Sequence, residues 1–420
     1  MSKIHERFEM LRDPNKPRSI LMPIEWVASI IPLLLARQKV RKHNMKGLKG
    51  PFLIFSNHAA MIDFQVAVKA TFPHKSQWVI SIEEFVGREW LMRGIGGIPK
   101  RKFTTGPTLI KQIMRCIRVN KKNVVIYPEA RYSLAGITED MSVAMGKMAK
   151  LAGVPVIVIN QKGHFIHQPQ WNKKPVRSLK CVADVTCVAT AEETKTLSAE
   201  ELQKRIVDAM QYDDFKYVLD NKIKVRCKKR AERIHKILYK CPHCGKEYMM
   251  DSKGIKLWCN NCGAEWEMNE YCQLHCTNKE EKFTHVPDWY RWERQCVIDE
   301  VENGTYVFED DVRIEELISG KIGFIKTGTI KMRQDNEGIH LHGKLDNGQE
   351  FNLEKPAETT ASIHIEYNFK KRGDAIDINT LDATWFVYPL HYDNVLTKIH
   401  FATEAIYQKA LRDKGLIDKH

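Results

Sequence analysis

Short apolar runs alternate with amphipathic stretches through the first half of the chain. Five of these runs are rich in β-branched or aromatic residues and have the length of single strands: 52–55, 78–82, 124–127, 154–159 and 181–189. Helical patterns separate them, which is typical of strands covered by helices on both faces of a sheet. The pattern therefore predicts an α/β domain over residues 51–215, built on a mostly parallel sheet.

The end of the chain has a different pattern, in which short strands follow one another. Asp346-Asn347-Gly348 predicts a hairpin turn between strands at 340–345 and 350–353. Further strands are expected at 362–369, 375–378 and 384–388, before a final helix at 394–411. Residues 285–420 are thus predicted to form a β-rich domain whose order of elements resembles a pleckstrin-homology module.

The most apolar segment, residues 20–36, lies within an N-terminal region that we delimit as 1–50. Pro23, Glu25 and Pro32 interrupt it, and its length is at the short limit for crossing a bilayer. Basic residues follow it at Arg37, Lys39, Arg41, Lys42 and Lys46. An apolar face beside cations is typical of a helix lying in a membrane interface, and the alternative is a buried helix.

Composition narrows the choice of compartment and partner. The 420 residues are 43% hydrophobic and carry a formal net charge of +14, so the surface should attract polyanions or anionic lipids. The chain has 11 cysteines and its first residues lack a secretory leader, which favours a reducing compartment. We expect a peripheral or monotopic protein on the cytoplasmic face of a membrane.

Four cysteines have the spacing of a structural zinc site. Cys241 and Cys244 form one Cys-x2-Cys pair, and Cys259 and Cys262 form another. Four thiolates complete a tetrahedral zinc shell and leave no position for a catalytic water. We predict a zinc ribbon over residues 241–280, preceded by a basic helical linker over 216–240.

One polar motif follows the first predicted strand directly. His58 lies five residues before Asp63 in the segment Asn57-His58-Ala59-Ala60-Met61-Ile62-Asp63. A histidine whose ring is oriented by a carboxylate can remove the proton from a hydroxyl group and so make it a nucleophile. His58 and Asp63 are therefore candidate catalytic residues.

Three further segments follow this motif in order: Gly96-Gly97-Ile98-Pro99-Lys100-Arg101, Tyr127-Pro128-Glu129-Ala130-Arg131 and Val154-Pro155-Val156. Together the four resemble the sequence blocks of the glycerolipid acyltransferase superfamily, which includes the 1-acyl-glycerol-3-phosphate O-acyltransferases. The resemblance covers roughly residues 51–210.

The resemblance implies roles for individual residues. His58 would be the general base and Asp63 its orienting carboxylate, and Asn57 and Gly97 belong to the same substrate-binding blocks. Arg101 would contact the phosphate of the acceptor, Glu129 would position its glycerol part, and Pro155 would shape the acyl pocket. Arg131 lies one place early relative to the family pattern, with Tyr132 in the usual arginine position, which weakens its assignment as a phosphate ligand.

The sequence thus predicts a phospholipid-synthesis enzyme, an O-acyltransferase that uses acyl-CoA or acyl carrier protein. Its acceptor would be a membrane lysophospholipid, with lysophosphatidate favoured. The alternative is a zinc-ribbon nucleic-acid-binding protein that uses the basic residues 216–240. Acids within the ribbon, such as Glu265 and Glu267, make nucleic acid an unlikely partner. The sequence does not identify a protein partner of the C-terminal region.

Overall fold

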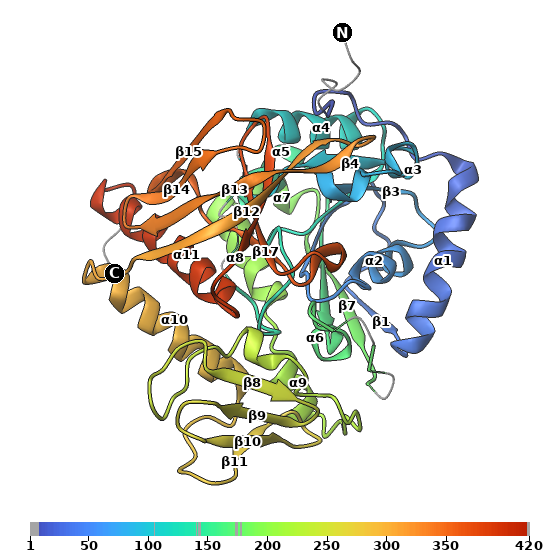
Figure 1. The fold of residues 1–420 in the computed structure, drawn as a ribbon. Helices are drawn as coiled ribbons and strands as arrows, with labels where there is room; N and C mark the ends of the chain where they lie inside the picture. Colours follow the sequence, from blue (N-terminus) through green and yellow to red (C-terminus); the bar gives the residue numbers. More distant parts are fainter. Residues whose placement is uncertain are drawn as a thin grey trace. The chain divides into compact units, whose positions relative to one another are not determined.

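The computed structural model describes residues 8–104, 106–139, 141, 144–172, 175–176 and 179–417. The chain divides into two compact units (Figure 1). The first unit ends at Cys227 and leaves out Arg101–Thr104; the second combines Arg101–Thr104 with the chain from Lys228 onward. The N-terminal region predicted as 1–50 begins with seven residues that lie outside the described part.

A seven-stranded sheet forms the centre of the first unit, in the order β1-β7-β6-β2-β5-β3-β4. Its strands are β1 (Lys39–His43), β2 (Leu53–Ser56), β3 (Ser76–Ser81), β4 (Gly97–Lys100), β5 (Asn123–Ile126), β6 (Val156–Lys162) and β7 (Val182–Ala189). All pairs are parallel except β6 with β7. The predicted mostly parallel sheet is confirmed.

The five apolar runs all form strands, whereas β1 and β4 have no such signal. β1 is the charged, largely exposed segment Lys-Val-Arg-Lys-His, and β4 contains Gly97 and Pro99. Both lie at the edges of the sheet, where a strand needs only one hydrogen-bonded neighbour; β4 is buried, but Gly97 and Pro99 break up its apolar pattern. Pattern alone therefore identified the five inner strands and missed the two edges.

Helices surround this sheet. They are α1 (Met22–Leu35), α2 (Asp63–Thr71), α3 (Glu89–Gly94), α4 (Pro107–Arg118), α5 (Met145–Ala152), α6 (His164–His167), α7 (Glu193–Thr196), α8 (Ala199–Met210) and α9 (Asp214–Asp220), with short 3-10 turns at Ser19–Leu21 and Ile82–Phe85. Side chains from α4, α5 and α8 pack on the central strands to form the core. Ser198 caps α8 by accepting a hydrogen bond from the Glu201 N–H at 3.0 Å.

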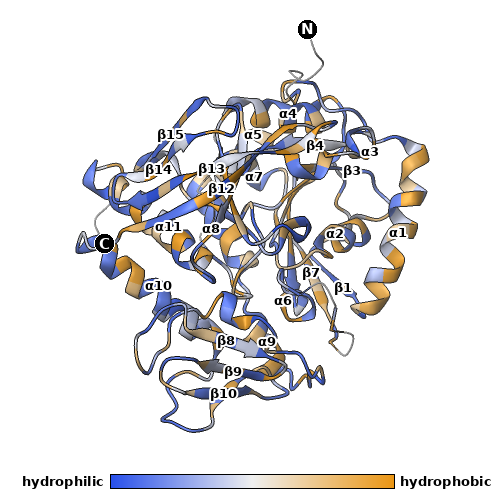
Figure 2. Ribbon diagram, in the orientation of Figure 1, coloured by the Kyte–Doolittle hydropathy of each residue, from blue (hydrophilic) through white to orange (hydrophobic). Residues whose placement is uncertain are grey.

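Helix α1 leaves much of its apolar surface exposed to solvent. Ile24, Val27, Ile30, Ile31 and Leu34 are each more than half exposed. Figure 2 shows the hydrophobic colouring along this helix. Among the described residues, no helix combines the length and apolarity needed to span a membrane.

The second unit begins with turns and a small antiparallel sheet. The helix expected over 216–240 is corrected by the structure: α9 ends at Asp220, and only a 3-10 turn at Ile234–Lys236 follows in this segment. Neighbouring like charges disfavour a continuous helix there. The sheet has the order β11-β10-β9-β8, with β8 (Met250–Lys253), β9 (Lys256–Cys259), β10 (Glu265–Met268) and β11 (Leu274–Cys276).

The rest of the second unit is an antiparallel sheet with two long helices. Its strands are β12 (Phe308–Ser319), β13 (Gly323–Asp335), β14 (Gly338–Lys344), β15 (Glu350–Pro356), β16 (His364–Glu366), β17 (Ala375–Asn379) and β18 (Thr384–Pro389). The helices are α10 (Val286–Glu302) and α11 (Leu396–Asp413), with 3-10 turns at Ala357–Thr359 and Phe369–Lys371. The predicted β-rich region is confirmed, and the Gly348 N–H closes the predicted hairpin turn on the Leu345 carbonyl.

Candidate active site

His58 and Asp63 meet at the carboxyl end of β2. His58 lies in the loop that leaves this buried strand, and Asp63 is the first residue of α2. The His58 Nδ1 and Asp63 Oδ2 atoms are 2.8 Å apart. The His58 side chain is 21% exposed and its Nε2 makes no hydrogen bond within the described chain, so this nitrogen faces outward from the pair. The arrangement is that of a base oriented by a carboxylate.

The backbone holds the Asp63 carboxylate in place. Its Oδ2 accepts hydrogen bonds from the N–H groups of Ala59 at 2.6 Å and Ala60 at 3.0 Å. Complete burial raises the pKa of Asp63, whereas the bonds from His58 and from the two N–H groups favour the carboxylate and oppose that rise. The loop therefore supplies part of the solvation that Asp63 loses in the interior.

Two tyrosines enclose the His58 ring. The ring centroid of Tyr127 lies 4.4 Å from that of His58 in a stacked arrangement, and the Tyr132 centroid lies 4.1 Å away. The His58 carbonyl also accepts a hydrogen bond from the Ser133 N–H at 2.7 Å. Tyr127 and Tyr132 were not among the residues predicted for the site. The sequence feature that could have identified them is their position on either side of the Pro128-Glu129 block.

Glu129 reaches the same loop from the neighbouring strand. β5 pairs with β2 in parallel, so the loops after both strands lie at one edge of the sheet. The buried Glu129 side chain accepts a hydrogen bond from the His58 N–H at 3.2 Å. Burial raises the pKa of Glu129 to about 8, with Arg131 opposing the shift. The tertiary fold thus brings together three residues that the sequence pattern had selected: His58, Asp63 and Glu129.

Asn57 connects the loop to the strand on the other side of β2. Its Nδ2 donates to the Gln161 carbonyl at 2.9 Å, and its Oδ1 accepts from the Gln161 N–H at 2.7 Å. Both residues are fully buried. Asn57 therefore bonds β6 in the way that a backbone segment would, and it leaves the adjacent His58 facing the site.

The two candidate phosphate ligands are already engaged elsewhere. Arg131 is buried and forms an ion pair with Glu139. Arg101 belongs to the second unit, where it donates to the carbonyls of Leu381 at 3.1 Å and Asp382 at 3.0 Å. A charged side chain with such partners is not free to meet a ligand without exchanging them.

The remaining predicted residues lie in the sheet. Gly97 is the first residue of β4, and a Cβ atom there would lie 2.6 Å from the Met92 carbonyl oxygen. Pro155 directly precedes β6, and its carbonyl accepts the Leu53 N–H at 3.1 Å. Both positions therefore control how closely neighbouring backbone segments approach.

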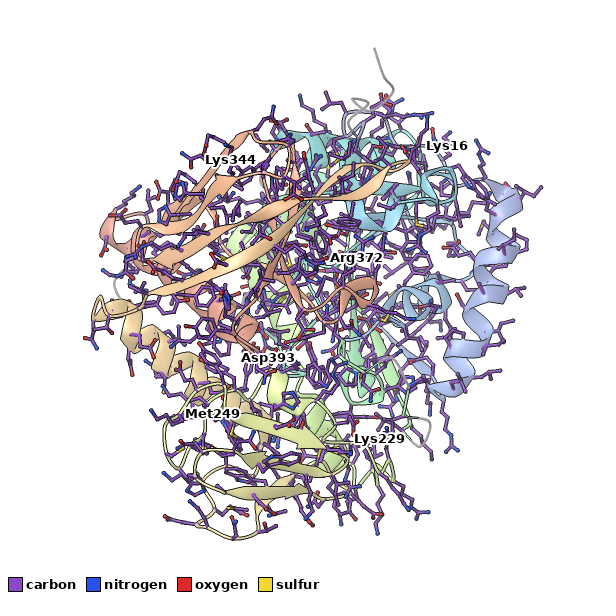
Figure 3. The ribbon with its side chains drawn as sticks, in the orientation of Figure 1. Lys16, Lys229, Met249, Lys344, Arg372 and Asp393 are labelled. Atoms are coloured by element: carbon purple, nitrogen blue, oxygen red, sulfur yellow. The ribbon has the colours of Figure 1, made fainter. Side chains whose placement is uncertain are left out.

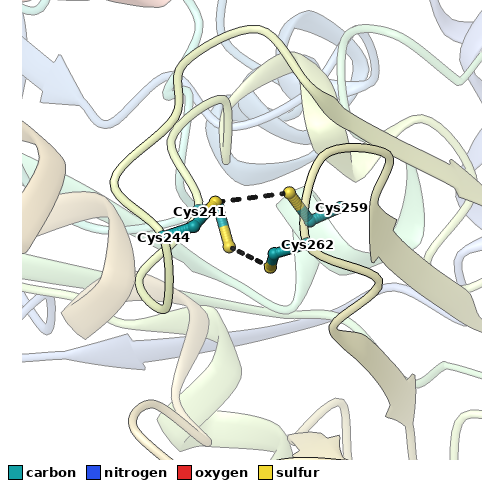
Figure 4. Close-up of side chains that lie close together, drawn as sticks. All are labelled: Cys241, Cys244, Cys259 and Cys262. Carbon is teal, nitrogen blue, oxygen red and sulfur yellow. Dashed lines mark hydrogen bonds between the residues drawn. The ribbon is translucent and has the colours of Figure 1, made fainter.

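The four predicted cysteine ligands form one cluster in the second unit (Figure 4). The Sγ atoms of Cys241 and Cys262 are 3.7 Å apart, and those of Cys244 and Cys259 are 3.8 Å apart. A tetrahedral centre with Zn–S bonds of about 2.3 Å requires S–S separations of about 3.8 Å. The donor set and its spacing therefore fit a closed structural zinc site.

Comparison with known proteins finds a similar solved structure and a matching protein family. The chain is similar in structure to the 1-acyl-sn-glycerophosphate (LPA) acyltransferase PlsC from Thermotoga maritima, at 16% sequence identity and a TM-score of 0.37, over 48% of this chain and 80% of that one. No curated protein matches the chain. Residues 37–161 match the protein family described as Acyltransferase, and this range includes the His58–Asp63 pair. The family similarity therefore covers β1, β2, β3, β4, β5 and most of β6, together with the His58–Asp63 pair.

Proposed function

We propose that the chain transfers a fatty acyl group from a thioester, on coenzyme A or acyl carrier protein, to the hydroxyl of a lysophospholipid. The observation that carries this proposal is the 2.8 Å bond between His58 Nδ1 and the buried Asp63, which leaves His58 Nε2 for the substrate. Asp63 holds the proton on Nδ1, so Nε2 has the lone pair that a general base needs.

The proposed reaction has two steps. His58 Nε2 accepts the hydroxyl proton as the acceptor oxygen attacks the thioester carbonyl, and a tetrahedral intermediate forms. Its collapse breaks the carbon–sulfur bond, and the departing thiolate takes the proton from the His58 imidazolium. Asp63 stabilises that imidazolium between the two steps.

The acceptor that we favour is lysophosphatidate. Glu129 lies against the backbone of His58 and would orient the glycerol part beside the base. Arg101 and Arg131 remain proposed phosphate ligands, and each would have to exchange its present partners for the ligand. We assign Asn57 and Gly97 positioning roles, because their contacts are with the backbone of the sheet, and we assign Pro155 to the acyl pocket.

Helix α1 would place this domain at the membrane surface. Its exposed apolar side chains suit the acyl boundary, and the basic residues from Arg37 to Lys46 suit anionic headgroups. Burial raises the pKa of Glu25 on this helix to about 7, and this acid is not among the exposed apolar side chains that would meet the membrane.

We assign structural zinc to the four cysteines of the ribbon. With four sulfur ligands the ion has no open position, so it would hold the two Cys-x2-Cys loops together and take no part in acyl transfer. A module this small gains much of its folding free energy from such an ion.

The decisive experiment is acyl transfer by the His58→Ala variant. Purified protein is incubated with an acyl thioester and a panel of lysolipids, and the products are identified by mass. We expect wild type to acylate lysophosphatidate and His58→Ala to lose roughly 10²-fold or more in kcat, the usual contribution of a general base.

His43→Ala is the matched control, because His43 also pairs with an aspartate, Asp184, at 3.1 Å in the same unit. This variant should keep the wild-type rate. Equal rates for wild type and His58→Ala would disprove the mechanism, and acylation of a different lysolipid would change only the acceptor.

A further inference from the structure

The second unit contains a cavity of about 650 Å³ that the proposed acyl transfer does not use. It lies where the segment before the zinc ribbon meets the antiparallel sheet and the start of α11. Four basic residues line it: Arg233, Lys236, Arg313 and Arg372. Figure 3 labels Arg372 and also Asp393, another lining residue. This volume is typical of pockets for small organic ligands.

Two of the four cations are held side by side. The buried Glu315 carboxylate lies 2.6 Å from Arg372 Nη1 and 3.6 Å from Arg313 Nη1. Arg313 also donates to the Arg372 carbonyl at 2.7 Å, and its guanidinium lies 4.0 Å from the centre of the Tyr388 ring. These contacts fix the positions of both guanidinium groups before any ligand arrives, which lowers the entropy lost on binding.

A third cation of the lining, Lys236, comes from the segment before the zinc ribbon. Lys236 pairs with Asp374 at 2.9 Å, and the other oxygen of Asp374 accepts the Asn368 N–H at 2.8 Å. Within the lining, four basic residues face two acidic ones, Asp374 and Asp393, and the Glu315 carboxylate beside Arg313 and Arg372 still leaves the cations in excess. The balance of charge favours an anion.

The start of α11 adds to this preference. Asn394 and Leu396 line the cavity, α11 has 18 residues, and neither a side-chain cap nor an acid occupies its first turn. The positive end of a long helix attracts anions.

We propose that this cavity binds a phosphate ester. The guanidinium groups of Arg313 and Arg372 suit phosphate oxygens. A soluble metabolite and the headgroup of a lipid both offer this chemistry, and the test below distinguishes the two sources. None of the residues that line the cavity belongs to the proposed acyl-transfer site. Phosphate binding here therefore does not depend on the proposed reaction.

The test compares binding by two variants of the full, zinc-containing chain. Arg372→Gln removes one pocket cation, and Arg333→Gln is the matched control on β13. Arg333 is similarly exposed and also pairs with carboxylates, but it does not line the cavity. Calorimetric titration with glycerol 3-phosphate tests the soluble source; flotation with phosphatidylcholine vesicles, with and without phosphatidate, tests the lipid source.

We expect wild type to bind in at least one arm, and Arg372→Gln to bind roughly tenfold more weakly or worse, since a charge-assisted hydrogen bond is lost. Arg333→Gln should bind like wild type. If Arg372→Gln lowers the midpoint of thermal unfolding and Arg333→Gln does not, Arg233→Gln is used as the pocket variant instead. It must then show the same loss of binding. Unchanged binding by the pocket variant, an equal loss in Arg333→Gln, or no saturable binding by wild type in either arm would overturn the proposal.

Discussion

At the scale of single residues, Asp63 controls what His58 can do. One oxygen of Asp63 accepts three hydrogen bonds, from the His58 ring and from the N–H groups of Ala59 and Ala60. Asp63→Asn keeps the size of the side chain but cannot stabilise an imidazolium by charge. We expect kcat to fall about 10²-fold or more with little change in KM, measured by steady-state acyl transfer.

The control for this variant is Asp184→Asn, which removes the charge from the exposed His43–Asp184 pair. It should leave kcat unchanged. If the Asp63 and Asp184 variants have the same kcat, the carboxylate beside His58 has no special part in the reaction.

The raised pKa of Glu129 predicts that the stability of the fold depends on pH. Its pKa is about 8 in the folded chain because of burial, against an ordinary value of 4.5. Between these values the folded state holds a proton that the unfolded state has lost, so the Glu129 contribution to the unfolding free energy falls as pH rises. Glu129→Gln cannot lose that proton.

We therefore expect Glu129→Gln to gain stability relative to wild type on going from about pH 5 to about pH 8, measured by urea unfolding. Asp214, whose pKa burial raises to about 7, is common to both proteins and cancels in the comparison. A difference in stability that does not depend on pH would show that Glu129 is ionised in the fold.

At the scale of elements, helix α1 exposes large apolar side chains that take no part in the core. Ile31 and Leu34 on this helix are 69% and 70% exposed. Gln is a good helix former, so replacing both residues by Gln should preserve the helix. The replacement removes apolar surface that a membrane would cover. We expect binding to anionic vesicles to fall by roughly tenfold or more, measured by cosedimentation.

The matched control replaces Leu11 and Trp90, which are 77% and 68% exposed and lie outside α1, by Gln. Vesicle binding should then stay at the wild-type level. An equal effect of both double variants would mean that α1 is not the docking surface.

At the scale of the whole molecule, the chain consists of two compact units, and only the second holds the cysteine cluster. We expect one zinc ion per chain by metal analysis, lost in Cys262→Ser. Loss of zinc should lower the midpoint of the unfolding transition that belongs to the second unit and leave that of the first unchanged.

Cys296→Ser is the control, because Cys296 is also partly buried in the second unit but lies on α10, outside the cluster. It should keep both the zinc and the midpoint. Full zinc content in Cys262→Ser would contradict the proposed ligand set.

The sequence alone determined the features that depend on local pattern. Buried strands of the first unit need continuous apolar runs, so all five were visible, as was the hairpin at Asp346-Asn347-Gly348. The Cys-x2-Cys pairs and the His58-x4-Asp63 spacing were also visible, because their chemistry depends on residues that are close along the chain. Edge strands β1 and β4 were not visible, because β1 is charged and largely exposed and the four residues of β4 include Gly97 and Pro99.

Only the tertiary structure decided which distant residues meet. It brought Glu129 to the backbone of His58 through the parallel pairing of β2 and β5, and it placed Tyr127 and Tyr132 against the imidazole. It also gave Arg131 a partner in Glu139 and grouped Arg101 with the second unit. A sequence motif states which charges are present, but the free energy of a buried charge depends on partners that the chain brings from elsewhere.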